Sequence, residues 1–126
     1  MTRTIRAVLH DPEGETIYRR IPDTLEAIRE FVGGYVEGHL VVLGGRRCVA
    51  YCHEEGRLLG MPPSVCWPDG EVYMVGKVVL TSPDGRGGDD DVLPGTYRRM
   101  VERGWSDVPW EGRRLSILVM DEGAVQ

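Results

Sequence analysis

The stretch GHLVVLGGRRCVAYC, residues 38–52, decides the central part of the fold. It contains two runs of strand-forming residues, one on each side of Gly44 and Gly45. Paired glycines favour a two-residue hairpin turn in which both central residues have positive φ. The first run is almost wholly apolar, so we expect it in the middle of a sheet with both faces covered. The stretch therefore predicts an antiparallel hairpin inside a larger sheet.

Two strands and a helix are predicted before this hairpin. Residues 4–11 alternate between apolar and other side chains, the turn sequence DPEGE follows, and residues 16–22 resume an extended pattern. Asp23 and Glu26 have the spacing of a capping box, which predicts that a helix begins there. The apolar stripe of that helix ends at a Gly-Gly pair, a common helix stop.

The segment HEEGRLLGMPPS, residues 53–64, follows neither the helix period nor the strand period. We expect a hairpin tip at residues 54–56, after which Leu58, Leu59 and Met61 fold back onto the sheet. The two prolines would hold the chain extended where no ladder hydrogen bonds are needed. One further strand is predicted over residues 71–81, in which Gly76 indicates a bulge or a close backbone contact.

The C-terminal third predicts a loop, a helix and a strand. Residues 82–91 predict a flexible, acidic, glycine-rich loop, and residues 92–104 have the apolar stripe of a helix. Residues 105–110 are expected to be irregular, and residues 113–121 to form the last strand. The order β-β-α-β-β-β-α-β predicts a single α+β domain over residues 1–126, with a mostly antiparallel sheet and two helices on one face.

Composition and charge limit the class of protein. The 126 residues are 41% hydrophobic, which fits one packed domain. Fifteen bases against twenty acids give a net charge of −5, which argues against nucleic acid as a partner. Neither a signal-peptide core nor an apolar run of roughly 20 residues is present, so we expect a cytoplasmic protein that does not interact with membranes. Three cysteines argue against a disulfide framework.

Metal-ligating residue types are present, but their spacing does not indicate a metal site. Cys48 and Cys52 lie in one predicted strand, about 13 Å apart when extended, and cannot share an ion. Cys52, His53 and Cys66 could converge, with His39 also available, but small buried cysteines explain the pattern better. We therefore predict neither a metal nor a cofactor.

Catalytic patterns are not evident in the sequence. It contains no G-x-S-x-G nucleophile elbow and no H-E-x-x-H motif. Ser64 follows two prolines and has no predicted base nearby. His53 with its two following glutamates is typical of a solvated turn. The sequence thus predicts a non-enzymatic protein.

Two groups of residues are candidates for binding a ligand or partner. Arg46 and Arg47 follow the glycine pair and could hold an anion such as a nucleotide, although they should point to opposite faces of their strand. Trp105 and Trp110 flank a proline and could stack on a base, anchor a partner, or cover the core. His53 and Met61, both in the segment HEEGRLLGMPPS, are further candidates. The full candidate set is Arg46, Arg47, His53, Met61, Trp105 and Trp110.

Three stretches carry a resemblance to a known family: VGGYVEGHLV, EEGRLLGMPPS and VGKVVL. Together they resemble a family of small proteins of unknown function that are common in phages, plasmids and other mobile elements, including phages of actinobacteria. The matching residues are Val32, Gly33, Gly34, Val36, Glu37, Glu54, Glu55, Gly56, Leu59, Gly60, Pro62 and Gly76. His53, Arg57 and Ser64 depart from the family pattern, and the residues from Ser82 onward lie outside it.

The resemblance implies a phage or mobile-element origin, and it transfers no catalytic residue. We therefore expect an accessory protein that binds a host or defence component. An alternative is a protein that sequesters a small anionic ligand such as a nucleotide signal. Such a protein could be a homo-oligomer. A small hydrolase is the second alternative. The sequence leaves the partner, the ligand and the oligomeric state open.

Overall fold

The central hairpin is present in the computed structural model, which describes residues 2–122. Strand β3 (Val36–Leu43) pairs antiparallel with β4 (Arg46–His53), and Leu43 lies opposite Arg46. Gly44 and Gly45 have φ of 63° and 84°, as the two central residues of a primed turn require. The predicted hairpin and its two-residue turn are confirmed.

The main sheet has the strand order β2-β1-β7-β4-β3, and β8 pairs with the end of β7. Its other members are β1 (Thr4–His10), β2 (Thr16–Pro22), β7 (Val78–Pro83) and β8 (Asp89–Asp90). Every pairing in it is antiparallel. The expectation that residues 38–43 lie centrally is wrong, because β7 inserts between β1 and β4 and leaves β3 at the edge. Leu40 on this edge strand is 56% exposed.

A second, smaller sheet has the order β6-β5-β10-β9. Its strands are β5 (Pro63–Cys66), β6 (Val72–Val75), β9 (Trp105–Trp110) and β10 (Arg113–Val119). Only β5 and β10 are parallel within it. Residues 105–110, expected to be irregular, therefore form a strand. The structure confirms an α+β domain with mostly antiparallel sheets, although residues 2–122 form ten strands rather than six.

The single strand predicted over residues 71–81 is two strands in different sheets. The chain leaves β6 and enters β7 through Gly76, whose φ is 78°. A Cβ atom at Gly76 would lie 2.7 Å from the sulfur of Met61. The close contact expected at this glycine is therefore real, and it marks the point where the chain passes from one sheet to the other.

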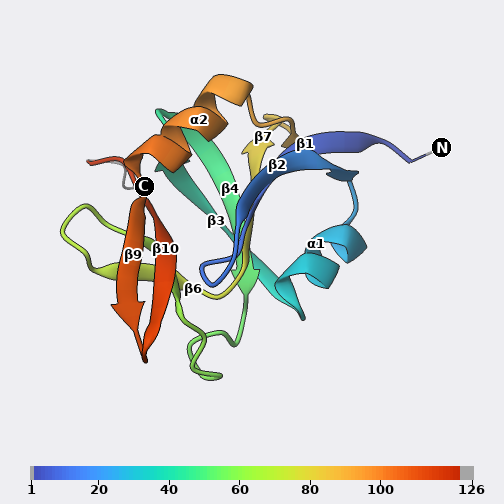
Figure 1. Ribbon diagram of the computed structural model, residues 1–126. Helices are drawn as coiled ribbons and strands as arrows, with labels where there is room; N and C mark the ends of the chain where they lie inside the picture. The colour runs from blue at the N-terminus through green and yellow to red at the C-terminus, as the bar shows by residue number, and fades with distance from the viewer. Residues whose placement is uncertain (1, 123–126) are drawn as a thin grey trace.

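The two helices pack on opposite faces of the main sheet, so the prediction of one shared face is wrong (Figure 1). Helix α1 (Leu25–Val32) packs against β7, β4 and β3 and places Ile28 in the cluster that contains Leu9 of β1. Helix α2 (Pro94–Arg103) packs through Met100 into the cluster that contains Val8. Because successive residues of a strand point to opposite faces, Val8 and Leu9 place the helices on different sides. The second sheet packs on the α2 side.

Each helix begins slightly differently from the prediction. The N-cap of α1 is Thr24, one residue after Asp23, and its hydroxyl accepts a hydrogen bond from the Ala27 amide at 3.1 Å. Gly33 ends the helix with φ of 95°, as the glycine pair predicted. Helix α2 starts with Pro94 in its first turn and has no side-chain cap. Neither helix in residues 2–122 is long and apolar enough to span a bilayer.

The segment between β4 and β5 connects the two sheets, so the prediction of a hairpin tip at residues 54–56 is wrong. Leu58 and Leu59 are 83% and 59% exposed, whereas only Met61 folds back as expected. The chain is extended at the prolines as expected, and Pro63 begins β5. The Arg57 guanidinium donates to the carbonyls of Val72 and Tyr73 at 3.3 Å and 3.0 Å, and these bonds tie the segment to β6.

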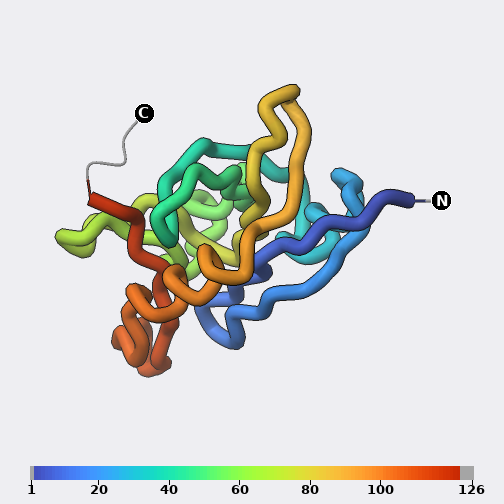
Figure 2. Tube along the Cα trace, turned by 90° about the horizontal axis from the view of Figure 1, so that it is seen from above, coloured from blue at the N-terminus to red at the C-terminus, as the bar shows by residue number. Residues whose placement is uncertain are grey.

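Residues 82–91 contain a short hairpin that projects beyond the rest of the molecule (Figure 2). The Asp89 carboxylate accepts hydrogen bonds from the hydroxyls of Tyr51 at 2.8 Å and Thr81 at 2.7 Å. Burial is the main reason why the pKa of Tyr51 is raised, and the bond to Asp89 adds to it. These contacts attach β8 to the sheet, while the mobility of the hairpin tip stays a prediction.

Candidate functional site

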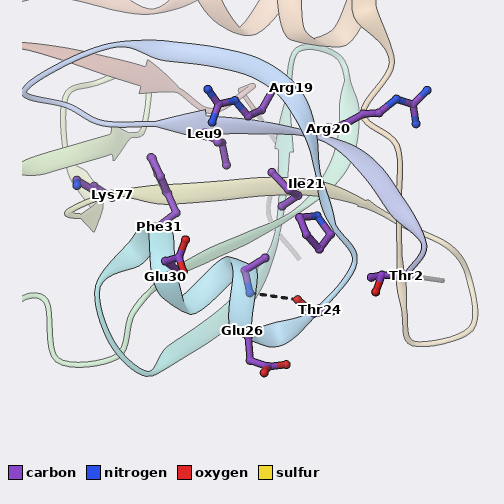
Figure 3. Close-up of a pocket in the computed structure, with 12 residues that line it drawn as sticks. Thr2, Leu9, Arg19, Arg20, Ile21, Thr24, Glu26, Glu30, Phe31 and Lys77 are labelled. Atoms are coloured by element: carbon purple, nitrogen blue, oxygen red, sulfur yellow. Dashed lines mark hydrogen bonds between the residues drawn. The ribbon is translucent and has the colours of Figure 1, made fainter.

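A groove of about 700 Å³ runs between helix α1 and strand β2. Figure 3 shows Thr2 near one end of it and Lys77 near the other. Leu9, Ile21 and Phe31 lie between the helix and the strand and supply an apolar floor (Figure 3). The arrangement combines an apolar surface with polar groups around it, which is typical of binding sites.

The groove results from the sharp connection between β2 and α1. The Thr24 amide donates to the Pro22 carbonyl at 2.8 Å, and the Asp23 amide donates to the Arg3 carbonyl at 2.8 Å. The chain therefore reverses at once from the strand into the helix. Ile28 and Val32 fill the space beneath the helix, while Phe31 stays half-buried at its side.

Three cations line the groove, Arg19, Arg20 and Lys77, although Arg20 follows Arg19 in β2 and points to the other face of the strand. None of them forms an ion pair within residues 2–122. The Arg20 guanidinium donates only to the Thr4 hydroxyl, at 3.4 Å, and the Lys77 ammonium lies 5.5 Å from the centre of the Phe31 ring. Unpaired cations beside an apolar floor favour a ligand that is both apolar and anionic.

Acidic side chains on α1 offset this charge only in part. Glu26 and Glu30 also line the groove. The Glu26 carboxylate extends away from β2 and its arginines (Figure 3). The strand side of the groove therefore remains basic on a chain whose net charge is −5.

Strand β2 also has a free edge beside the groove. It pairs with β1 alone, so in the part of the chain that the structure describes its second edge has no strand partner. Unpaired amides and carbonyls at such an edge can template another extended chain. The groove and the edge together can therefore accept an extended peptide whose alternate side chains enter the groove.

Arg46 and Arg47, predicted as anion ligands, lie at the exposed start of β4 and not in this groove. Adjacent strand residues point to opposite faces, so the two guanidiniums diverge as expected. The turn before them lies against α2, where a Cβ atom at Gly45 would be 3.1 Å from the Arg99 guanidinium. The pair is therefore not gathered around one anion site.

The two predicted tryptophans lie at opposite ends of β9, about 16 Å apart along the strand. Trp110 is half-buried and packs against the cluster of Cys66, Leu115 and Ile117, so it covers the core of the second sheet. Trp105 is 36% exposed and lies near Gly70. The sequence left open whether the tryptophans cover the core or contact a partner. Trp110 covers the core, whereas Trp105 is exposed enough to contact a partner.

His53 and Met61, the remaining predicted residues, make local contacts. The His53 Nδ1 accepts a hydrogen bond from the Glu55 amide at 3.0 Å. Met61 fills the space above two glycines, Gly56 and Gly76. None of the six predicted residues lines the α1–β2 groove. The sequence signal for the groove was the Arg19–Arg20 pair in the strand that precedes the helix.

The three thiols are all buried and protonated. Burial raises the pKa of Cys48 to about 12 and that of Cys52 to about 11, and it also raises the pKa of Cys66. A thiol with a raised pKa is a poor nucleophile. Cys52 and His53 point to opposite faces of β4, so they do not converge with Cys66.

A serine and a histidine do approach each other in the core. His10 Nε2 lies 3.2 Å from the Ser64 carbonyl oxygen, and His10 Nδ1 lies 2.7 Å from the Thr16 hydroxyl. Both His10 and Ser64 are 0% exposed, and the imidazole contacts the serine carbonyl rather than its hydroxyl. The pair lacks both the nucleophile–base bond and the substrate access of a hydrolase site.

The chain was compared with known protein families, curated proteins and solved structures. Residues 5–103 match a family model described as "Domain of unknown function (DUF3846)". Neither a curated protein nor a solved structure matches the chain.

Proposed function

The chain belongs to the DUF3846 family of unknown function, and we propose that it is a non-enzymatic binding protein that captures an extended acidic segment of a partner protein. The α1–β2 groove and the free edge of β2 form the proposed recognition surface. The observation that carries this proposal is the pair of cations beside the apolar floor, Arg19 and Lys77, neither of which has an ion-pair partner within residues 2–122. From the family resemblance, we further propose a phage or mobile-element origin and a host or defence protein in the bacterial cytoplasm as the partner.

The proposed complex uses main-chain and side-chain contacts together. Hydrogen bonds to the edge of β2 supply affinity, and alternate side chains of the bound segment supply specificity. Apolar side chains would cover Leu9, Ile21 and Phe31, while carboxylates would meet Arg19 and Lys77. Since the chain as a whole is acidic, an acidic partner is repelled elsewhere and attracted at this rim, which favours one orientation.

The two alternatives from the sequence have weaker support. A nucleotide-sequestering site built from paired arginines and a tryptophan lacks the required convergence, because Arg46 and Arg47 diverge and Trp110 covers the core. A hydrolase lacks an activated nucleophile among the buried thiols and in the His10–Ser64 contact.

Charge reversal in the groove tests the proposed function. The probes are short fluorescent peptides that alternate Val with Glu or Val with Lys, and binding is measured by anisotropy. Wild-type protein is expected to bind the Glu peptide about tenfold more tightly than the Lys peptide, a difference of about 1.4 kcal/mol. Arg19→Glu combined with Lys77→Glu is expected to abolish that preference.

The matched control is Arg98→Glu combined with Arg99→Glu, which makes the same change of charge on the exposed face of α2. This variant should keep the preference of the wild type. Equal affinity of the wild-type protein for both peptides would contradict the proposal. Loss of the preference in the α2 variant would contradict it as well, because the effect would then come from net charge.

A further inference from the structure

A cluster of three metal-ligating side chains lies on the face of the main sheet opposite the groove. Glu37 and His39 come from β3 and Cys52 from β4, and their ligand atoms all lie within 4.8 Å of one another. The His39 Nε2 is 3.6 Å from the Glu37 carboxylate. Among residues 2–122 it is the one group of at least three His, Cys, Asp or Glu side chains with ligand atoms this close.

The register of the central hairpin brings the three together. Glu37 lies directly opposite Cys52, and His39 is two residues further along β3, on the same face. Val41 and Leu43 continue that face into the core shared with the second sheet. The turn at Gly44 and Gly45 therefore fixes both the pairing and the cluster.

A cavity of about 430 Å³ adjoins the cluster. The three side chains line it together with Tyr73 of β6 and Arg57 of the connecting segment. The Tyr73 ring stands edge-on to the His39 ring, with centroids 6.0 Å apart, and so restricts the imidazole. Cys52 is only 6% exposed, whereas the Glu37 and His39 side chains are 51% and 39% exposed. Solvent and ions can thus reach the site from the cavity side.

We propose that Glu37, His39 and Cys52 bind one zinc ion, with a fourth coordination position open to the cavity. Oxygen, nitrogen and sulfur donors of these types are all zinc ligands, and three protein ligands with one open position are typical of accessible zinc sites. Tetrahedral zinc with bonds of about 2.0–2.3 Å separates neighbouring ligand atoms by roughly 3.3–3.8 Å. The 3.6 Å between His39 and Glu37 already fits, so only a small movement of the thiol side is required.

The charges of the site are also suitable. A carboxylate and a thiolate together neutralise a divalent cation, and zinc displaces the proton of the thiol on binding. The mixed donor set, with one soft sulfur ligand, favours zinc over magnesium or calcium, which take oxygen ligands. Arg57, which also lines the cavity, donates to the carbonyls of Val72 and Tyr73.

Metal titration of the purified full-length protein tests the site. After chelation and removal of the chelator, Co²⁺ is added as a spectroscopic probe and is then displaced by Zn²⁺. We expect one ion per chain and an absorption band from charge transfer between the thiolate and cobalt. Cys52→Ser should remove the band, and His39→Gln or Glu37→Gln should weaken binding at least tenfold. The last two side chains are exposed, so these variants keep the fold.

His53→Gln is the matched control, because His53 follows Cys52 and lines the same cavity but lies outside the cluster, and its Nδ1 accepts a hydrogen bond from the Glu55 amide. It should bind cobalt and zinc as the wild type does. Binding well below one ion per chain would overturn the proposal. So would a charge-transfer band that persists in the Cys52→Ser variant, or an equal loss of affinity in the His53→Gln variant. These outcomes are independent of the α1–β2 groove, which lies on the other face of the sheet.

Discussion

Replacing Gly44 by Ala is expected to destabilise the protein by about 3 kcal/mol. Gly44 has φ of 63°, a left-handed conformation that costs a residue with a side chain about 1–2 kcal/mol. A Cβ atom there would also lie 2.4 Å from the Thr96 carbonyl oxygen, which belongs to the backbone of α2. Because a helix backbone cannot move aside as a flexible side chain can, the hairpin and α2 must separate. Urea denaturation followed by circular dichroism measures the change.

The neighbouring Gly45→Ala variant separates the two causes. Gly45 also has positive φ, 84°, but a Cβ atom there would meet only the flexible Arg99 guanidinium, at 3.1 Å. We therefore expect Gly45→Ala to cost about 1 kcal/mol, the conformational part alone. Equal losses at the two positions would show that α2 does not pack against the turn as described.

Acidification is expected to remove about 3 kcal/mol of stability through one buried side chain, His10. Burial lowers the pKa of His10 from 6.5 to about 4, against smaller opposing effects of the Ser64 carbonyl and Asp11. Between those values the unfolded chain binds a proton that the folded protein does not, so stability falls as the pH falls from about 6.5 to about 4. Above this range, the neutral imidazole is the stable form in both states.

The His10→Gln variant isolates this effect from the carboxylates that titrate in the same range. The free energy of unfolding is measured for wild type and variant across the pH range. Their difference should shrink by about 3 kcal/mol between neutral pH and pH 4, because glutamine binds no proton. A difference that stays constant with pH would contradict the buried neutral histidine.

The sequence correctly predicted the elements that depend on neighbouring residues, such as turns and helix ends. The primed turn at Gly44 and Gly45 fixed the central hairpin, and the stop at Gly33 fixed the end of α1. The positions of these elements depend on contacts between distant residues. β3 lies at the edge because β4 pairs with β3 on one side and with β7 on the other. β7 begins at Val78, far along the chain from the end of β3 at Leu43. A periodic pattern carries no information about which distant strand will pair.

The candidate sites show the same limit. The Arg19–Arg20 pair is visible in the sequence, but the groove beside it exists only because α1 packs on β7, β4 and β3 and leaves a space next to β2. Part of the metal cluster could have been predicted from the sequence, because a two-residue turn at Gly44 and Gly45 places Glu37 directly opposite Cys52. Cys52 and its sequence neighbour His53, which the sequence suggested as joint ligands, cannot serve one ion, because adjacent strand residues point to opposite faces.

Amide hydrogen exchange of the free protein and of its complex with the Val-Glu peptide tests the proposed recognition surface most directly. If an extended acidic segment adds to the edge of β2, the outward-facing amides of residues 17–21 should exchange about tenfold more slowly in the complex. Amides of β3, the other edge strand of the main sheet, should exchange at unchanged rates. Unchanged exchange in β2, or protection that appears at β3 instead, would contradict the account.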